Sequence, residues 1–183
     1  MSTTTTREPL SISASMSTKM LPAVLVALVV ALFYWSHPWS NPLAAIVFIV
    51  AALTDSLDGY LARRLGLTTP LGEFLDPVAD KLMVATALVL LVGHDTRPLI
   101  VITAVVIVGR EITVSALREW MAHLGARSKV AVSGMGKVKT IVQMTGLSMM
   151  MFRSDLFGLP IYEIGVVLLV IAGVLTLWSM VSY

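Results

Sequence analysis

Six long apolar stretches constrain this chain more than any other feature of its sequence. A helix that crosses the hydrocarbon core of a bilayer, about 30 Å thick, needs roughly 20 apolar residues. The composition agrees with membrane helices, because 57% of the 183 residues are hydrophobic and only 13% are charged, which is too apolar for a water-soluble domain of this size. Short polar breaks separate the predicted helices, which cover residues 20–36, 42–63, 74–93, 98–121, 135–152 and 162–182.

The predicted fold is therefore all-α, a polytopic bundle of six transmembrane helices. Since the breaks are short, no segment is large enough for a second globular domain, and we expect one transmembrane domain over residues 20–183. Residues 1–19 are polar and low in complexity, and we expect them to form an N-terminal cytoplasmic tail. Membrane lipids are the expected surroundings, and no nucleic-acid partner is expected.

The positive charges predict the orientation of the bundle. If the N-terminus is cytoplasmic, 11 of the 13 Lys and Arg residues fall on the cytoplasmic side, and only Arg97 and Arg153 fall outside. Basic residues concentrate in the cytoplasmic loops of membrane proteins. The distribution therefore favours a cytoplasmic N-terminus and, after six crossings, a cytoplasmic C-terminus.

Four aspartates lie within or beside two of the apolar stretches: Asp55, Asp58, Asp76 and Asp80. A carboxylate there costs several kcal/mol unless it is paired, bound to a metal or open to water. Spacings of three and four residues place each pair on one helical face, and the second helix runs inward while the third runs outward, so both pairs lie at a similar depth. The four carboxylates repel one another at such a distance, and hard divalent cations such as Mg²⁺ or Mn²⁺ relieve this repulsion most simply. The chain has no cysteine, which excludes thiolate metal sites.

Small residues follow the same helical faces as the aspartates. Gly59, Ala62 and Gly72 would let a substrate approach the backbone closely, and Arg63 offers a fork of donors suited to phosphate oxygens. The alternative is a solvated loop whose acids pair with the neighbouring arginines and Lys81. That alternative does not account for the small residues.

These positions together read Asp55-x-x-Asp58-Gly59-x-x-Ala62-Arg63, then eight residues, then Gly72-x-x-x-Asp76-x-x-x-Asp80. The pattern resembles the signature of the CDP-alcohol phosphotransferase family at every specified position. The resemblance implies that two divalent ions are held by Asp55, Asp58 and Asp76 with help from Asp80, and that Asp80 is also the catalytic general base. It further implies that the CDP nucleotide is bound by Gly59, Ala62, Arg63 and Gly72.

The resemblance also implies a reaction and a place in the cell. An alcohol displaces CMP from a lipid carried as a CDP-activated diphosphate, and two metal ions can neutralise the attacking and leaving oxygens of such an in-line displacement. For this chain, the lipid substrate implied is CDP-diacylglycerol. The expected setting is the bacterial cytoplasmic (inner) membrane, with the active site facing the cytoplasmic side, and the family resemblance favours a homodimer.

A second region bears on the acceptor alcohol. Residues 109–120, which begin Gly-Arg-Glu, and residues 136–144 resemble the members of the family whose acceptor is sn-glycerol 3-phosphate. Its phosphate requires cations outside the nucleotide site, and Arg110 lies roughly 18 Å along its helix from Pro98, at the depth of the aspartates. The candidates for binding that phosphate are Arg110, Arg118, Lys137 and Lys139. The alternatives are an ion pair between Arg110 and Glu111, and snorkelling of the two lysines to lipid headgroups.

One segment departs from the family. Members commonly carry an Asn, a Thr and an Arg in a short helix before the first membrane segment, whereas the Asn and the Arg are absent between Ser11 and Lys19. We therefore assign no function to the N-terminal segment.

Other functions remain open at the level of sequence. Within the family, the acceptor could be serine, inositol phosphate or a second phosphatidylglycerol. From another class, a divalent-cation transporter also places carboxylates inside the membrane, although Arg63 and Gly72 do not suit a cation path. A catalytically inactive scaffold would have no need of four aspartates.

Overall fold

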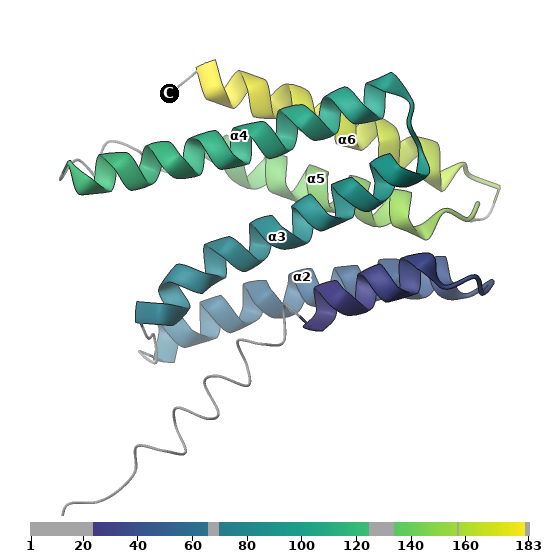
Figure 1. Cartoon of the computed structure of the whole chain (residues 1–183), viewed down its shortest axis with the longest axis horizontal. Helices are drawn as coiled ribbons and strands as arrows, with labels where there is room; N and C mark the ends of the chain where they lie inside the picture. The colour runs from purple at the N-terminus through teal and green to yellow at the C-terminus, as the bar shows by residue number, and fades with distance from the viewer. Residues whose placement is uncertain (1–23, 66–69, 125–133, 157, 182–183) are drawn as a thin grey trace, which may run out of the picture.

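The computed structural model describes residues 24–65, 70–124, 134–156 and 158–181, and within them the chain is all-helical (Figure 1). An isolated bridge between Leu156 and Leu159 is the one strand-like pairing in these described ranges. The six helices lie at the positions that the apolar stretches predict, and the all-α fold is confirmed. They are an unlabelled first helix, Val24–Tyr34, followed by α2 (Ser40–Leu65), α3 (Pro70–His94), α4 (Pro98–His123), α5 (Gly134–Phe152) and α6 (Ile161–Val181). The predicted tail over residues 1–19 lies outside the described residues.

Local sequence explains where several helices begin and end. Pro98 begins α4, where its missing N–H costs no helical hydrogen bond. Just before it, the Arg97 N–H donates to Asp95 Oδ1 at 3.1 Å, a local bond that turns the chain between α3 and α4. Arg153 directly follows α5 with a φ of 56°, in the left-handed region where helices commonly end. Later in the α5–α6 connection, Gly158 also has a positive φ, 78°.

Helix α5 is central to the packing. It contacts α2, α3 and α6, and its contact with α6 is the most extensive in the described chain. A Cβ atom added at Gly165 of α6 would lie 2.9 Å from the carbonyl oxygen of Gly146 in α5. The two backbones therefore approach closely because both positions are glycine, as small residues allow at helix interfaces in membranes.

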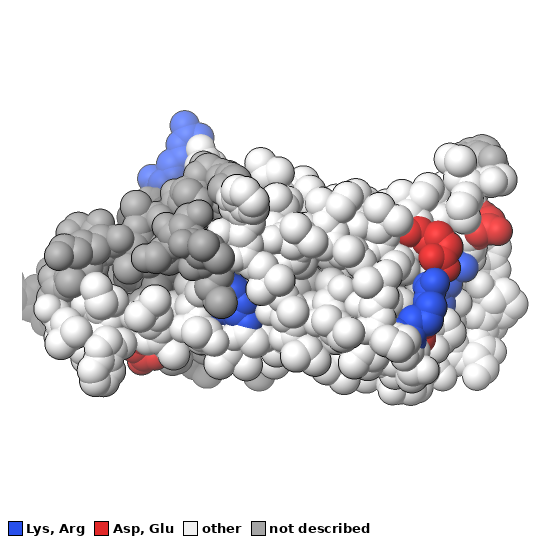
Figure 2. Space-filling model, turned by 90° about the horizontal axis from the view of Figure 1, so that it is seen from above, with Lys and Arg blue, Asp and Glu red and all other residues white. Residues whose placement is uncertain are grey.

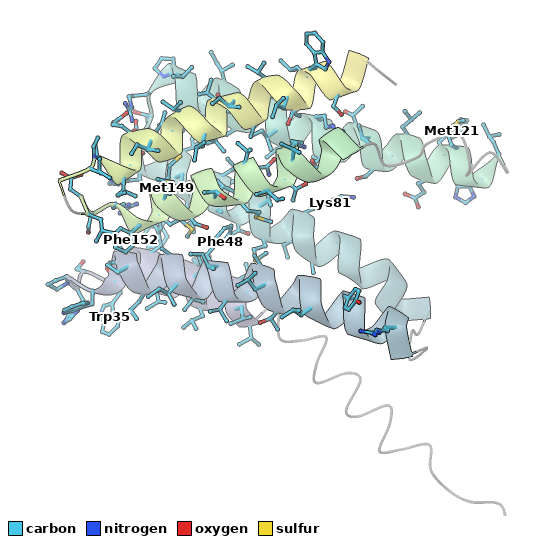
Figure 3. All side chains as sticks on the ribbon, turned by 180° about the vertical axis from the view of Figure 1, so that it is seen from behind. Trp35, Phe48, Lys81, Met121, Met149 and Phe152 are labelled. Carbon is cyan, nitrogen blue, oxygen red and sulfur yellow. The ribbon has the colours of Figure 1, made fainter. Side chains whose placement is uncertain are left out.

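The core lies between the described helices α2 to α6, with α3 and α6 packing against both α4 and α5. Figure 3 shows Phe48 of α2 on the side of its helix that faces α5, and its side chain is fully buried. Leu91 of α3, Ile107 of α4 and Leu147 of α5 are also fully buried in the same cluster. These contacts hold the helices that carry the predicted site residues in one packed unit.

The outer surface is largely apolar, as a membrane protein requires. Two helices are long and apolar enough to cross a bilayer by length and composition, Pro98–Met121 within α4 and Ile161–Ser179 within α6. The apolar part of α2 is Ser40–Thr54 and that of α3 is Lys81–His94.

Charged side chains gather at the end of the bundle that carries the α3–α4 and α5–α6 turns (Figures 1 and 2). Arg97 pairs with Asp95 at 2.8 Å and with Glu163 at 3.0 Å, which ties the α3–α4 turn to the start of α6. Burial disfavours the charged form of Asp95, but hydrogen bonds from Arg97 and Tyr162 outweigh it and hold the pKa of Asp95 below its ordinary value. Arg153, whose guanidinium lies 4.0 Å from the centre of the Phe33 ring, follows α5 at this same end. The two basic residues predicted to lie outside thus occupy one end of the molecule.

Candidate active site

The aspartate pattern spans the second half of α2 and the first half of α3. Asp58 lies seven residues before the end of α2 at Leu65, and Asp76 lies six residues after the start of α3 at Pro70. At a rise of about 1.5 Å per residue these positions are roughly 10 Å from the helix ends, and Asp55 and Asp80 are both roughly 15 Å from them. The two helices run in opposite directions from a connection of only four residues (Figure 1). Their backbones therefore place the two pairs at matching levels.

The side chains of the four aspartates lie outside the described residues, so their convergence stays a prediction. The same holds for Arg63, whereas the backbones of all these positions are helical. The nucleotide positions Gly59, Ala62 and Gly72 fall in the same halves of α2 and α3. Four carboxylates within largely apolar helices offer only oxygen ligands, which are the ligands that a hard divalent cation prefers. Among the side chains that the structure does describe, no group of three or more potential ligands could hold a metal ion.

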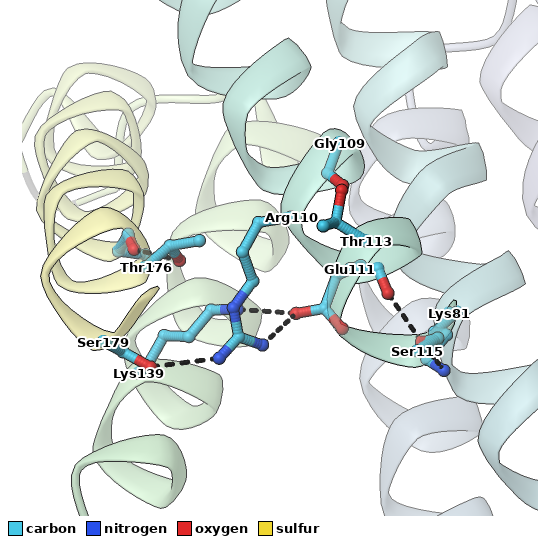
Figure 4. A network of polar contacts seen from close by, with 10 residues as sticks. Lys81, Gly109, Arg110, Glu111, Thr113, Ser115, Lys139, Thr176 and Ser179 are labelled. Carbon is cyan, nitrogen blue, oxygen red and sulfur yellow. Dashed lines mark hydrogen bonds and ion pairs between the residues drawn. The ribbon is translucent and has the colours of Figure 1, made fainter. Parts of the chain in front are cut away.

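A partly buried cluster of charged side chains joins α4, α5 and α6 (Figure 4). Lys139 Nζ of α5 donates to Glu111 Oε1 of α4 at 2.6 Å, and Arg110 Nη1 donates to the same oxygen at 3.4 Å. Arg110 Nη2 also donates to Ser179 Oγ of α6 at 3.0 Å. The side chains of Lys139 and Arg110 are only 4% and 10% exposed. We call Arg110, Glu111 and Lys139 the cationic cluster.

The cationic cluster carries more positive than negative charge. The ion pair between Arg110 and Glu111, which was the alternative to phosphate binding, is present. Among the described side chains it does not neutralise the cluster, because Lys139 shares the same carboxylate oxygen, although Lys139 also makes a further interaction. In addition, Arg110 Nε is buried and has no hydrogen-bond partner in the described chain. Buried charges need compensation, so the cluster favours an anion such as a phosphate group. Lys139 does not snorkel to the surface.

A small cavity of about 60 Å³ lies between this cluster and α3. Lys81 Nζ of α3 donates to Ser115 Oγ of α4, and Ser115 Oγ donates to the Glu111 carbonyl oxygen at 2.6 Å. Because Lys81 directly follows Asp80 in α3, the cavity lies between the cationic cluster and the aspartate part of that helix. Six residues line it: Lys81, Val84, Glu111, Thr140, Gln143 and Met144.

Of the four predicted phosphate-binding residues, the structure thus brings two together, Arg110 and Lys139. Arg118 lies two helical turns beyond Arg110 in α4, and Lys137 lies in the first turn of α5, but both side chains lie outside the described residues. Sequence reasoning missed Glu111 as the residue that the two cations share. The signal was available, since an acidic residue in the middle of an apolar helix is costly and functional by default.

The comparison with known proteins decides the family. A sequence model of the CDP-alcohol phosphatidyltransferase family matches residues 13–178. The chain belongs to this family. The match begins before the first described helix and runs almost to the end of α6, so it includes every candidate site residue named above. The family resemblance of the aspartate pattern is confirmed.

Relatives from three bacteria share one name, CDP-diacylglycerol–glycerol-3-phosphate 3-phosphatidyltransferase. Those of Shigella flexneri serotype 5b and Escherichia coli K12 are each 50% identical over 140 residues, which cover 76% of this chain and 75% of the relative. That of Haemophilus influenzae is 51% identical over 142 residues, covering 77% and 75%. Family and names make the chain a transferase of phospholipid biosynthesis in a membrane, and the family generally depends on a divalent metal.

Proposed function

We propose that this chain is a phosphatidylglycerophosphate synthase. It transfers the phosphatidyl group of CDP-diacylglycerol to sn-glycerol 3-phosphate and releases CMP. The family and the shared name of its relatives support the reaction. The observation that carries the choice of acceptor is the cationic cluster, in which Arg110 and Lys139 share one carboxylate beside a cavity that reaches Lys81. An acceptor with its own phosphate matches this excess of positive charge, whereas serine or plain glycerol does not. Inositol phosphate also carries a phosphate, and it is the name shared by the relatives that favours sn-glycerol 3-phosphate over it.

In the proposed reaction, the hydroxyl oxygen of the acceptor forms a bond to the phosphorus that carries the diacylglycerol. The bond from that phosphorus to the oxygen of CMP breaks, and Asp80 takes the hydroxyl proton as general base. Arg110 and Lys139, with Arg118 and Lys137, hold the acceptor phosphate through charge-assisted hydrogen bonds. Gly59, Ala62, Arg63 and Gly72 bind the CDP group.

Asp55, Asp58, Asp76 and Asp80 would hold two divalent ions, Mg²⁺ or Mn²⁺. Bound there, the ions would neutralise charge on the diphosphate and on the attacking and leaving oxygens. The matching levels of the two aspartate pairs on α2 and α3 support this assignment. The cationic cluster also disfavours the competing function of a cation transporter, because a cation path lined by Arg110, Lys139 and Lys81 would repel its own cargo.

We place the protein in the bacterial inner membrane as a multi-pass protein with its active site on the cytoplasmic side. The support is the distribution of Lys and Arg, with Arg97 and Arg153 at the end of the bundle away from the aspartates. A homodimer is the proposed assembly.

The test is CMP release by the purified protein in detergent with CDP-diacylglycerol and a panel of acceptors. We expect release with sn-glycerol 3-phosphate, little with glycerol, serine or inositol phosphate, and loss of release when EDTA removes divalent ions. Equal rates with plain glycerol would overturn the acceptor, and full activity in EDTA would overturn the metal assignment.

A further inference from the structure

Gln143 of α5 is a largely buried residue on the wall of the small cavity. The residue is only 4% exposed, and no described side chain hydrogen-bonds its amide. The amide is not among the atoms that are fully sealed from solvent, so a water or a ligand group in the cavity can hydrogen-bond it. The cavity is where such a partner would bind.

The position of the cavity indicates which part of a ligand it would take. One wall of the cavity is formed by Lys81, which directly follows Asp80 in α3. The opposite wall includes Glu111, which belongs to the cationic cluster. An acceptor whose phosphate lies at the cluster and whose reacting hydroxyl lies near the aspartates must pass this cavity. A volume of about 60 Å³ suits one small group of the acceptor and not the whole molecule.

We propose that Gln143 binds the secondary hydroxyl of the acceptor and so determines specificity for a three-carbon polyol phosphate. The inference rests on the proposed function, in which the acceptor is sn-glycerol 3-phosphate. That acceptor carries its secondary hydroxyl on the carbon between the phosphate-bearing carbon and the reacting carbon. A side-chain amide can donate to a hydroxyl and accept from it at once. Lys81 and Glu111 of the same wall already bond to Ser115 and Lys139, whereas the amide of Gln143 makes no such bond to the described side chains and can serve as a directional partner for the hydroxyl.

A site built to hydrogen-bond a hydroxyl discriminates strongly against an analogue that lacks it, because the polar group of the site is then left unpaired. The matched analogue is 3-hydroxypropyl phosphate, which keeps the phosphate and the reacting hydroxyl. We expect the unmodified protein to favour sn-glycerol 3-phosphate over this analogue by about tenfold or more in kcat/KM. We expect Gln143→Met, which keeps the length and lack of branching of the side chain, to remove most of that preference by lowering kcat/KM for sn-glycerol 3-phosphate alone.

Met144→Leu is the matched control, because Met144 lines the same cavity without a polar group, and it should keep the preference. If Gln143→Met does not fold, Gln143→Leu tests the same loss of the amide. A kept preference in the Gln143 variant, or an equal loss for both acceptors, would overturn the inference while CMP release with sn-glycerol 3-phosphate still supports the proposed function. No CMP release from sn-glycerol 3-phosphate by the unmodified protein would overturn both.

Discussion

Replacing Arg110 by Gln should weaken binding of the acceptor and leave the lipid nucleotide unaffected. The structure makes this a fold-sparing change. Arg110 contributes the longer of the two contacts to Glu111, at 3.4 Å, and Lys139 at 2.6 Å still pairs with that carboxylate when the guanidinium is gone. The change also removes the bond from Arg110 Nη2 to Ser179 Oγ, a loss that acts on stability and not on the acceptor alone. The interaction lost to the acceptor itself is one charge-assisted contact to its phosphate, worth about 1.5–3 kcal/mol. That corresponds to a rise of roughly tenfold to a hundredfold in the KM for sn-glycerol 3-phosphate.

The assay is the initial rate of CMP release in detergent, with each substrate varied while the other is saturating. Arg97→Gln is the matched control, because Arg97 is exposed and pairs with Asp95 and Glu163 just before the start of α4, away from the cationic cluster. It should change neither KM. An equal rise in both KM values for Arg110→Gln would mean that Arg110 supports the fold or the metal site, and an unchanged KM for sn-glycerol 3-phosphate would remove it from the phosphate site.

Four further changes test other parts of the account. Asp76→Asn should abolish CMP release while circular dichroism shows unchanged helix content, and full activity in excess magnesium would contradict its assignment as a metal ligand. Asp80→Asn should lower kcat far more than it raises the KM for CDP-diacylglycerol, because a general base acts in the transition state; an unchanged kcat would contradict that function. Gly165→Ala places a Cβ atom 2.9 Å from a backbone oxygen of α5, and it should lower the free energy of unfolding by about 1–3 kcal/mol, measured as a lower melting temperature. Gly93→Ala is the control and should leave the melting temperature unchanged, because nothing lies within 4 Å of the added atom. Asp95 has a pKa below its ordinary value of 3.8, so the stability that its charged form gives to the fold is present above that pH and is lost as the pH falls through the lowered pKa. Asp95→Asn should therefore flatten the fall in melting temperature below about pH 4. An unchanged dependence of melting temperature on pH would count against the Asp95 contacts.

The positions of the helices could be predicted because each depends on a local property of the chain. Apolar runs of membrane length mark the helices, and polar breaks with residues such as Pro98 mark their ends. The aspartate spacing could likewise be interpreted, because intervals of three and four residues place side chains on one helical face whatever surrounds the helix.

Contacts between helices could not be predicted in the same way, since they depend on which faces meet. The sequence alone does not predict that Glu111 contacts both Arg110 and Lys139, because Arg110 lies on α4 and Lys139 on α5. The approach of α5 to α6 depends on two glycines 19 residues apart, Gly146 and Gly165. Neither glycine predicts this contact when it is considered alone. The place of Gln143 on the wall of a cavity can be seen only once α3 and α4 pack beside α5.

The most direct test of the central claim is the identity of the lipid product formed from CDP-diacylglycerol and sn-glycerol 3-phosphate labelled with ¹⁸O at the primary hydroxyl. The account predicts phosphatidylglycerophosphate that retains the label in the new bridging oxygen, together with unlabelled CMP, because the acceptor oxygen attacks phosphorus and the bond to CMP breaks. Mass spectrometry of the extracted lipid and of the released nucleotide measures both. Unlabelled phosphatidic acid together with CMP would show hydrolysis by water. Phosphatidic acid together with a labelled conjugate of cytidylate and glycerol 3-phosphate would show attack at the other phosphorus, and either result would contradict the account.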